Sequence, residues 1–499
     1  MNKTYSKKHF YYRLFINIFI CAFIFFSLSS YNISEETGEM INPDMPKVFL
    51  LITLGIYIVL GVYSYLFYKT SKYSYNERGI TCQRGVFFKR KSFLEYHKIH
   101  SVNKKQGIIQ QIFKIAYLVV DSGSTNTAHT AEILIIEDDN VVEELMKEFK
   151  KRQNQVFNDD VVVSNEETPS KKENLFKFTS KRKILYSLLN SMLGIVILLI
   201  LSVIGISVCS ILVGILKTNT FDILTVAIYI ILGAFGIAIF TLIGTILFSF
   251  IEFYNYRIYK ENNTIDVNYG LLVKNHNNFK IERVKGVRIK QNIIKRIFGF
   301  VSIDVEVIGY GNMDGQNNRV TSVLIPLCKE SEVNHYLELI LPKYIPQEKE
   351  HRSTSYFALY SWSLLIPLIV FVILGGFASI WLIFFNLYMP LLLIWLGISI
   401  LYLVVTIFTL VDRRLQFSNE GITICEDKIT LVHGGFNKTT TVILVKNIIG
   451  IDERTTPLRQ KNGISSYAIH FRSNAMTNTI FVDILSSEVK EKLLSVVKF

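Results

Sequence analysis

Six long apolar runs without Asp, Glu, Lys, Arg or His constrain this chain more than any other feature. They cover residues 14–30, 48–67, 185–216, 223–251, 357–386 and 391–411. Each run reaches or approaches the roughly 20 residues that an α-helix needs to cross a bilayer. A mean hydropathy of +0.32 agrees with a membrane protein. The runs therefore predict three transmembrane hairpins.

The charges that flank the first hairpin predict its orientation. Cations precede its first span, whereas acidic residues outweigh the single lysine of the loop between its spans. These residues are Lys3, Lys7, Lys8 and Arg13 before the span, and Glu35, Glu36, Glu39 and Asp44 in the loop. The positive-inside rule then places the N-terminus and every soluble part in the cytoplasm, because each hairpin returns the chain to the same side. A cleaved signal peptide over residues 14–30 is the alternative, and we rank it second because a partner span follows.

One stretch of soluble sequence occurs three times. Over residues 281–303 the apolar positions first suit a strand and then take the spacing of a helix face, before Gly299 and a second β-rich run. Residues 96–118 repeat these apolar positions, and residues 445–467 repeat the strand positions and glycines. The pattern predicts a strand, one or two helical turns, a glycine and another strand in each copy.

Each hairpin is followed by one copy of this pattern within a soluble module. Several short strands and a closing amphipathic helix, at 141–149, 332–341 and 487–497, are expected in each module. The fold class is therefore membrane α-helical hairpins plus repeated soluble α+β modules. The predicted order is hairpin 14–68, first module 69–150, linker 151–180, hairpin 184–251, second module 252–341, linker 342–355, hairpin 357–411 and third module 412–499.

The run RVKGVRIKQNIIKRIFGF at residues 283–300, which follows a hairpin and recurs along the chain, carries a resemblance. It is similar to bacterial pleckstrin-homology-like (PH-like) domain membrane proteins of the YdbS/YdbT type. The resemblance implies three small β-sandwich or barrel domains, each with a C-terminal helix, and no catalysis. The first copy departs from the pattern at Lys114, where glycine is expected. The third copy loses the apolar helix face, with Pro457, Lys461 and Asn462 in its place.

The sequence offers no motif for catalysis. It lacks HExxH, GxSxG and P-loop patterns, and its five cysteines form no CxxC pair. His97 and His100 lie near Glu95, but a half-exposed strand face explains them better than a metal site without a third ligand. We therefore expect no enzyme, cofactor or metal. Spans free of ionisable groups also disfavour a transporter, although a transporter or its accessory subunit stays the alternative.

The remaining functional signal is basic. The candidate membrane- or partner-binding residues are Lys285, Arg288, Lys290, Lys295 and Arg296 in the second module, and Lys89, Arg90 and Lys91 in the first. In one interpretation the apolar stripe of Ile293, Ile294, Ile297 and Phe298 packs into the core and the cations form a solvated face. In the other, the basic face lies against the anionic inner leaflet, which is worth about 1 kcal/mol for each Lys or Arg near the surface.

The expected function is protein–protein or protein–membrane assembly at the cell membrane by a non-enzymatic multi-pass protein. The expected partners are the lipid bilayer and either further copies of the chain or a smaller PH-like membrane protein. A net charge of +13 reflects cytoplasmic loops rather than a nucleic-acid partner in this interpretation. A role in tolerance of envelope stress or antimicrobial peptides is a hypothesis that no residue carries.

Overall fold

The computed structural model describes residues 3–30, 44–121 except 100, 133–158, 173–191, 194, 223–307 except 262, 322–352 except 349, 369, 373, 375, 389–455, and 460–496 except 462, 473–476 and 487. Most of the predicted spans 185–216 and 357–386, and the acidic part of the first hairpin's loop, lie outside these residues. The chain divides into two compact units. The first is built around strands β1–β11, and the second contains helix α6 and strands β12–β21.

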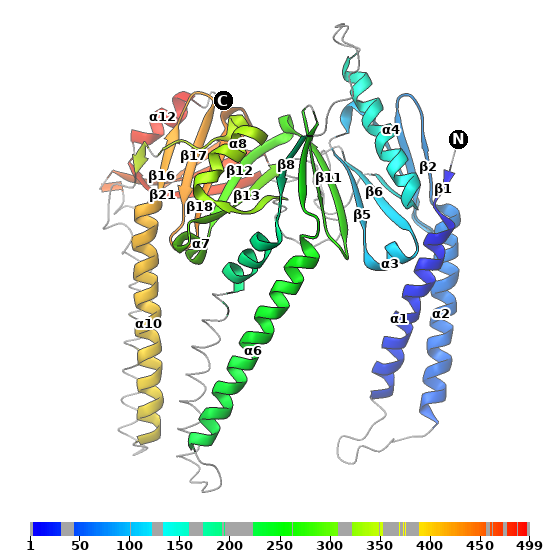
Figure 1. The fold of residues 1–499 in the computed structure, drawn as a ribbon, viewed down its shortest axis with the longest axis horizontal. Coiled ribbons are helices and arrows are strands. Elements are labelled where there is room, and N and C mark those ends of the chain that lie inside the picture. Colours follow the sequence, from blue (N-terminus) through cyan, green and yellow to red (C-terminus); the bar gives the residue numbers. More distant parts are fainter. Residues whose placement is uncertain are drawn as a thin grey trace. The chain divides into compact units, whose positions relative to one another are not determined.

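The first unit begins with a four-stranded sheet that holds a membrane hairpin between two neighbouring strands (Figure 1). Its elements are β1 (Lys3–Thr4), α1 (Lys7–Ser30), α2 (Met45–Thr70), β2 (Lys72–Tyr75), β3 (Gly79–Arg84) and β4 (Arg90–Glu95). Strand β1 precedes the hairpin and pairs antiparallel with β2, which follows it, so that Lys3 lies opposite Tyr73. The two ends of the hairpin therefore lie on the same side.

The second sheet of this unit has seven strands and joins two of the predicted modules. Its order is β7-β6-β5-β11-β10-β9-β8. The elements from the first module are the turn η1 (Tyr96–Lys98), β5 (Ser101–Gln106), α3 (Ile108–Ile112), β6 (Ile115–Asp121), β7 (Ile133–Asp138) and the closing helix α4 (Asp139–Asn158). The other four strands are β8 (Glu173–Lys177), β9 (Arg257–Glu261), β10 (Thr264–Tyr269) and β11 (Lys274–Lys280), followed by the turn η2 (Ile281–Arg283). We call the antiparallel pairing of β5 with β11 the first joint.

One apolar core fills the first module. Residues from the four-stranded sheet, from β5–β7 and from α4 contribute to it, including Ile80, Leu94, Leu118, Ile135 and Phe149. Strands β3 and β4 pack against β7. The first module is thus a sandwich of two sheets with α4 packed on the core, since inward-facing residues of both layers share one apolar interior.

The second unit repeats this construction. After α6 (Ile223–Glu252), the elements that complete the second module are β12 (Val284–Gln291), α7 (Ile293–Ile297), β13 (Phe300–Val307), β14 (Ser322–Lys329), η3 (Glu330–Glu332), α8 (Val333–Ile340) and η4 (Pro342–Tyr344). The four-stranded layer of the third module and its membrane helix are β15 (His351–Arg352), α10 (Met389–Asn419), β16 (Gly421–Ile424), β17 (Lys428–His433) and β18 (Lys438–Leu444). The chain then continues with η6 (Val445–Asn447), β19 (Ile448–Arg454), β20 (Ile464–Arg472), β21 (Thr477–Ser486) and α12 (Glu488–Val496). A seven-stranded sheet has the order β14-β13-β12-β18-β17-β16-β15, and β19-β20-β21 form a separate sheet. We call the pairing of β12 with β18 the second joint.

The structure confirms the repeated elements and corrects the linkers. The predicted strand, short helix, glycine and strand are β12, α7, Gly299 with φ of +68° and β13. Within the predicted linkers, however, α4 continues to Asn158, β8 joins the sheet of the first unit, and β15 pairs with β16. The boundary between the two units also falls between β11 and β12, inside the predicted second module.

Three described helices are long and apolar enough to cross a membrane: Lys7–Ser30, Met45–Thr70 and Leu232–Glu252. Helix α10 covers the predicted span 391–411. Few residues of these helices are buried within the chain, as expected of surfaces that face lipid.

Candidate functional site

Two of the predicted cations on β12 are paired with acidic residues of the neighbouring strand. Arg288 Nη2 lies 2.5 Å from Glu306 Oε1, and Lys290 Nζ lies 2.6 Å from Asp304 Oδ2. The Glu306 side chain is only 1% exposed. Strands β12 and β13 are antiparallel, which places these residues on adjacent or diagonal cross-strand positions. The expected solvated face is therefore wrong for Arg288, which is only 13% exposed, whereas Lys290 keeps 41% of its side chain exposed.

The other cations of this module also have local roles. Lys285 donates to Asn447 Oδ1 (3.1 Å), while Asn447 Nδ2 donates to the Lys285 carbonyl oxygen (3.2 Å). Lys295 is only 7% exposed, and its ammonium lies 5.3 Å from the centre of the Tyr186 ring. Burial lowers the pKa of Lys295. Arg296 is half-buried on the same short helix. These residues support the sheet and its neighbouring helix rather than forming one open basic surface.

The short helix α7 is turned opposite to the prediction. Ile297 is 71% exposed and Phe298 is also exposed, whereas Lys295 is buried. The first module shows the same arrangement, because Ile108 and Ile112 of α3 are exposed and Gln110 is buried. The expectation that this apolar stripe packs into the core is wrong for these side chains. Both copies present large apolar side chains at the tip between two strands.

In the first unit the exposed side chains of α3 lie at the base of a membrane helix. Phe113, directly after α3, packs against Tyr12 and Phe15 of α1, with ring centres 6.1 Å and 5.8 Å apart. Gln111 Nε2 donates to the carbonyl oxygens of Leu271 (3.1 Å) and Leu272 (2.8 Å) in the turn between β10 and β11. We define the apolar rim as the exposed residues Ile108, Ile112, Leu271, Leu272 and Val273.

Lys89, Arg90 and Lys91 form the only predicted basic cluster that is fully exposed among the described candidates. Arg90 and Lys91 begin strand β4 and Lys89 directly precedes it, after Phe87 and Phe88, which are also exposed. The positive φ of Gly85 (+112°) makes the tight turn before them, and a Cβ there would meet the Phe88 carbonyl oxygen at 2.1 Å.

The first joint carries polar contacts that the sequence did not suggest. Lys150 Nζ of α4 lies 3.1 Å from Asp266 Oδ1 of β10, and the Asn278 backbone N–H donates to Asn103 Oδ1 (3.0 Å). Burial raises the pKa of Asp266, but Lys150, Asn278 and His276 together outweigh burial and keep that pKa below its usual value. The contacts tie the closing helix of the first module to strands of the second. No local sequence pattern pairs residues so far apart.

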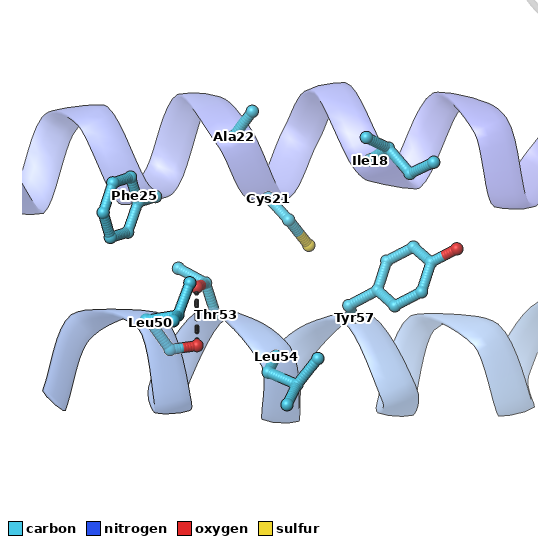
Figure 2. Close-up of a pocket in the computed structure, with 8 residues that line it drawn as sticks. All are labelled: Ile18, Cys21, Ala22, Phe25, Leu50, Thr53, Leu54 and Tyr57. Atoms are coloured by element: carbon cyan, nitrogen blue, oxygen red, sulfur yellow. Dashed lines mark hydrogen bonds between the residues drawn. The ribbon is translucent and has the colours of Figure 1, made fainter. Parts of the chain in front are cut away.

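A groove of about 410 Å³ lies between α1 and α2 (Figure 2). Cys21, Ala22 and Phe25 of α1 and Leu50 and Leu54 of α2 contribute to its mainly apolar lining. The hydroxyl of Thr53 donates to carbonyl oxygens of its own helix, at 2.9 Å and 3.0 Å. The lining contains no charged residue, so the groove suits hydrocarbon rather than a polar solute.

The predicted histidine pair does not form a described metal site. His97 Nε2 lies 3.4 Å from Glu95 Oε2, while His100 lies outside the described residues. Within the part of the chain that the structure describes, no group of three His, Cys, Asp or Glu side chains could hold a metal ion.

Comparison with known proteins identifies the family. The bacterial PH domain family matches residues 23–150 and 188–343, which is more than half of the chain. The chain belongs to the bacterial PH domain family. The matched segments contain the first and second modules, and the strand order of the third module repeats that of the first.

The chain is also similar to a membrane protein of Bacillus subtilis (strain 168), the UPF0699 transmembrane protein YdbT. The two are 22% identical over 417 residues, which cover 80% of this chain and 79% of the relative. No solved structure matches. Together with the apolar helices, this relative establishes a membrane protein that carries bacterial PH domains.

Replacing Glu306 by Gln should lower stability by about 3–5 kcal/mol, because Arg288 would keep its charge at a site with little access to water. Thermal unfolding of the full chain in detergent measures the change. Glu338→Gln, on the exposed face of α8, is the control and should change stability by less than about 0.5 kcal/mol. The double variant Arg288→Met/Glu306→Leu should recover most of the loss, and equal stability of Glu306→Gln and the control would contradict a buried pair.

Proposed function

We propose that this protein is a non-enzymatic membrane scaffold that presents three PH-like modules in the cytoplasm for protein–protein or protein–membrane assembly. One observation carries this proposal. Each seven-stranded sheet runs without interruption from one module into the next, through the first joint in one unit and through the second joint in the other. A sheet shared in this way makes successive modules parts of one framework, because their backbone hydrogen bonds belong to one ladder.

The apolar rim supports direct contact between the modules and the membrane. Its residues adjoin α3, whose neighbour Phe113 packs on α1 near the start of the span. Figure 1 shows α3 on the side of its sheets from which α1 and α2 extend. Exposed aliphatic residues in this place insert into the boundary between headgroups and acyl chains, as apolar faces of interfacial helices do.

The orientation rests on charge and on the way each hairpin enters a sheet. Strand pairs β1–β2, β8–β9 and β15–β16 each enclose one hairpin, so the chain leaves and re-enters on the same side. Cations at the soluble ends of the two helices, such as Lys7 and Arg13 in the first turns of α1 and Lys69 in the last turn of α2, favour the cytoplasm.

Cysteine accessibility tests this orientation. In intact cells, a membrane-impermeant maleimide should label Lys47→Cys, at the outer end of α2, but not Lys147→Cys of α4 until the membrane is permeabilised. Both lysines are exposed, so accessibility of the side chain itself is matched. The unsubstituted chain measures background from its own cysteines. The reverse labelling pattern would place the modules outside.

Fluorescent labelling tests the membrane contact. A label on Ile112→Cys or Ile297→Cys should be quenched by lipids brominated near the headgroup, because these positions are expected to reach about 5–10 Å into the interface. A label on Glu144→Cys, an exposed position of α4, should not be quenched. Equal quenching at all three positions would remove the membrane contact from the proposal.

Reconstitution separates the scaffold from the transporter alternative. The full chain, extracted from its own membranes into lipid nanodiscs, should carry further copies or another membrane protein in fixed stoichiometry. In sealed liposomes it should move no ion or solute, because the apolar runs 14–30, 48–67, 223–251 and 391–411 and the groove of Figure 2 contain no charged residue. Reproducible solute movement together with recovery as a single chain would favour transport.

If the assembly serves tolerance of membrane-active peptides, deletion of the gene should raise sensitivity to them.

A further inference from the structure

Among the strands that end a described sheet, two correspond to strands that form the joints elsewhere in the chain. Strand β4 ends the sheet β1-β2-β3-β4, and β19 ends the sheet β19-β20-β21. Within the repeat, β4 corresponds to β11 and β18, since each follows a turn with a glycine of positive φ: Gly85, Gly270 and Gly434. Likewise β19 corresponds to β5 and β12, since each follows a 3-10 turn. Each unpaired edge is therefore one half of a joint that the chain already forms twice.

The two existing joints share one register. His276 of β11 lies opposite Lys104 of β5 in the first joint, and Thr440 of β18 lies opposite Ile289 of β12 in the second. These two pairs occupy the same place in the repeat. The same register is thus formed with different side chains, so the backbone and the turn glycines determine it.

Exposure distinguishes the unpaired edges from the paired ones. On β4, Phe93 is 53% exposed, whereas the corresponding Asn278 and Val442 are buried in the joints. On β19, Ile449 is 51% exposed, and the strand is exposed along most of its length, unlike β5 and β12. In the register of the joints Phe93 would lie opposite Ile451, which packs at the border of the third module's core, whereas Ile449 lies in the β-bulge of β19.

The two edges share one complementary pair of charges. Strand β4 and the residue before it carry Lys89, Arg90 and Lys91, all exposed. Strand β19 carries Asp452, Glu453 and Arg454. The register of the joints places Glu453 opposite Lys91, and it places Arg454 opposite Arg90, a like-charge pair that opposes the contact. Both carboxylates already have partners, because Asp452 Oδ2 lies 2.9 Å from His470 Nε2 and Glu453 Oε2 lies 2.7 Å from Lys490 Nζ. A lysine arriving at Glu453 would add a second cation to an exposed pair.

We infer that β19 of one copy pairs antiparallel with β4 of a second copy in the same membrane, forming a third joint between chains. This inference rests on the proposed scaffold function and names its partner. In this joint Ile451 lies opposite Phe93, and Glu453 lies opposite Lys91. The two surfaces differ, so the contact is head-to-tail and builds a closed ring or an open filament of copies. Membrane hairpins hold all copies in one plane, which favours this edge-to-edge contact.

Disulfide cross-linking between two full-length chains with different tags tests the register. One chain carries Phe93→Cys and the other Ile451→Cys, both are produced in the same cells, and membranes are oxidised. A disulfide-linked dimer with both tags should form, with the bond between positions 93 and 451. The matched control pairs Lys89→Cys with Ile451→Cys. These positions share a face but lie about 13 Å out of register, beyond the roughly 7 Å between Cα atoms that a disulfide spans.

Three outcomes of this experiment would overturn the inference. Equal yields of the cross-linked dimer from the 93/451 pair and from the 89/451 control pair would show random collisions of chains rather than pairing of the two strands. A bond between positions 93 and 451 formed only within a doubly substituted chain would show that the chain closes on itself. Absence of any dimer with both tags would exclude the contact, because directly opposed cysteines in an antiparallel pair lie within disulfide reach.

A second variant keeps the result independent of cysteine geometry. Phe93→Lys places a charge on the free edge, a device that blocks edge pairing in natural sheets. It should reduce co-purification of two tagged copies about tenfold, equivalent to about 1.4 kcal/mol. Phe88→Lys, at an exposed turn position before the ladder, is the control and should leave co-purification unchanged.

If both edges instead cross-link to a different membrane protein, this inference fails and the scaffold function stands. If neither edge cross-links to any protein, both fail.

Discussion

The edge of an antiparallel sheet is the constraint on which this architecture depends. A strand with one neighbour leaves a row of N–H and C=O groups without a partner in the sheet, and proteins must cover, shorten or pair such edges. Each layer of a module ends in such strands, among them the last strand of the four-stranded layer and the first strand of the three-stranded layer. The first and second joints pair the edge of one module with the complementary edge of the next. The modules are thereby linked through backbone bonds, which depend little on side-chain identity.

This linkage explains why compact units and sequence modules do not coincide. The sequence repeats with one hairpin and one module, but the tightest contacts follow the shared sheets. The boundary between the units consequently lies between β11 and β12, in the middle of the second module. The first hairpin is inserted between the neighbouring strands β1 and β2, so α1 and α2 are anchored at both ends in one sheet. A hairpin cannot then reverse its orientation without breaking strand pairs.

Sequence patterns predicted the elements well because their periodicity is local. The alternation over 284–289, the closing helices and the turn glycines each depend on neighbours within a few residues, and the structure contains them all. The orientation of α7 was wrong for a physical reason. Spacing shows that Ile293 and Ile297 share a face, but not which way a five-residue helix turns. Here Asn292 caps it by accepting from the Lys295 N–H at 2.8 Å, and the lysine ammonium lies over Tyr186. Long polar side chains can be buried in this way when their stems pack and their heads find a ring.

Short strands before the hairpins escaped prediction for a different reason. Strand β8 has five residues within a polar stretch, and its signal is little more than the buried Phe176, with Phe178 beyond it. Strand β15 has only two residues. Such segments become strands because the backbone of a neighbouring strand offers them hydrogen-bond partners. Their own residues therefore do not predict them. The joints could not be predicted for the same reason, since Asn103 of β5 and Asn278 of β11 lie 175 residues apart in the sequence.

One cross-strand position shows how to separate structural charge from a binding site. In the second module Glu306 lies opposite Gly286, beside a β-bulge, and pairs with Arg288. In the third module the same place in the same bulge is held by His470, opposite Gly450, and it pairs with Asp452. The acidic and basic partners have changed strands while the contact has been kept. A surface that recognised an anionic ligand would have to retain the sign of its charge, whereas a pair that holds two strands in register needs only opposite signs. The basic residues of β12 therefore belong to the sheet, and Lys89, Arg90 and Lys91 on the free edge of β4 are the cations left to meet a partner.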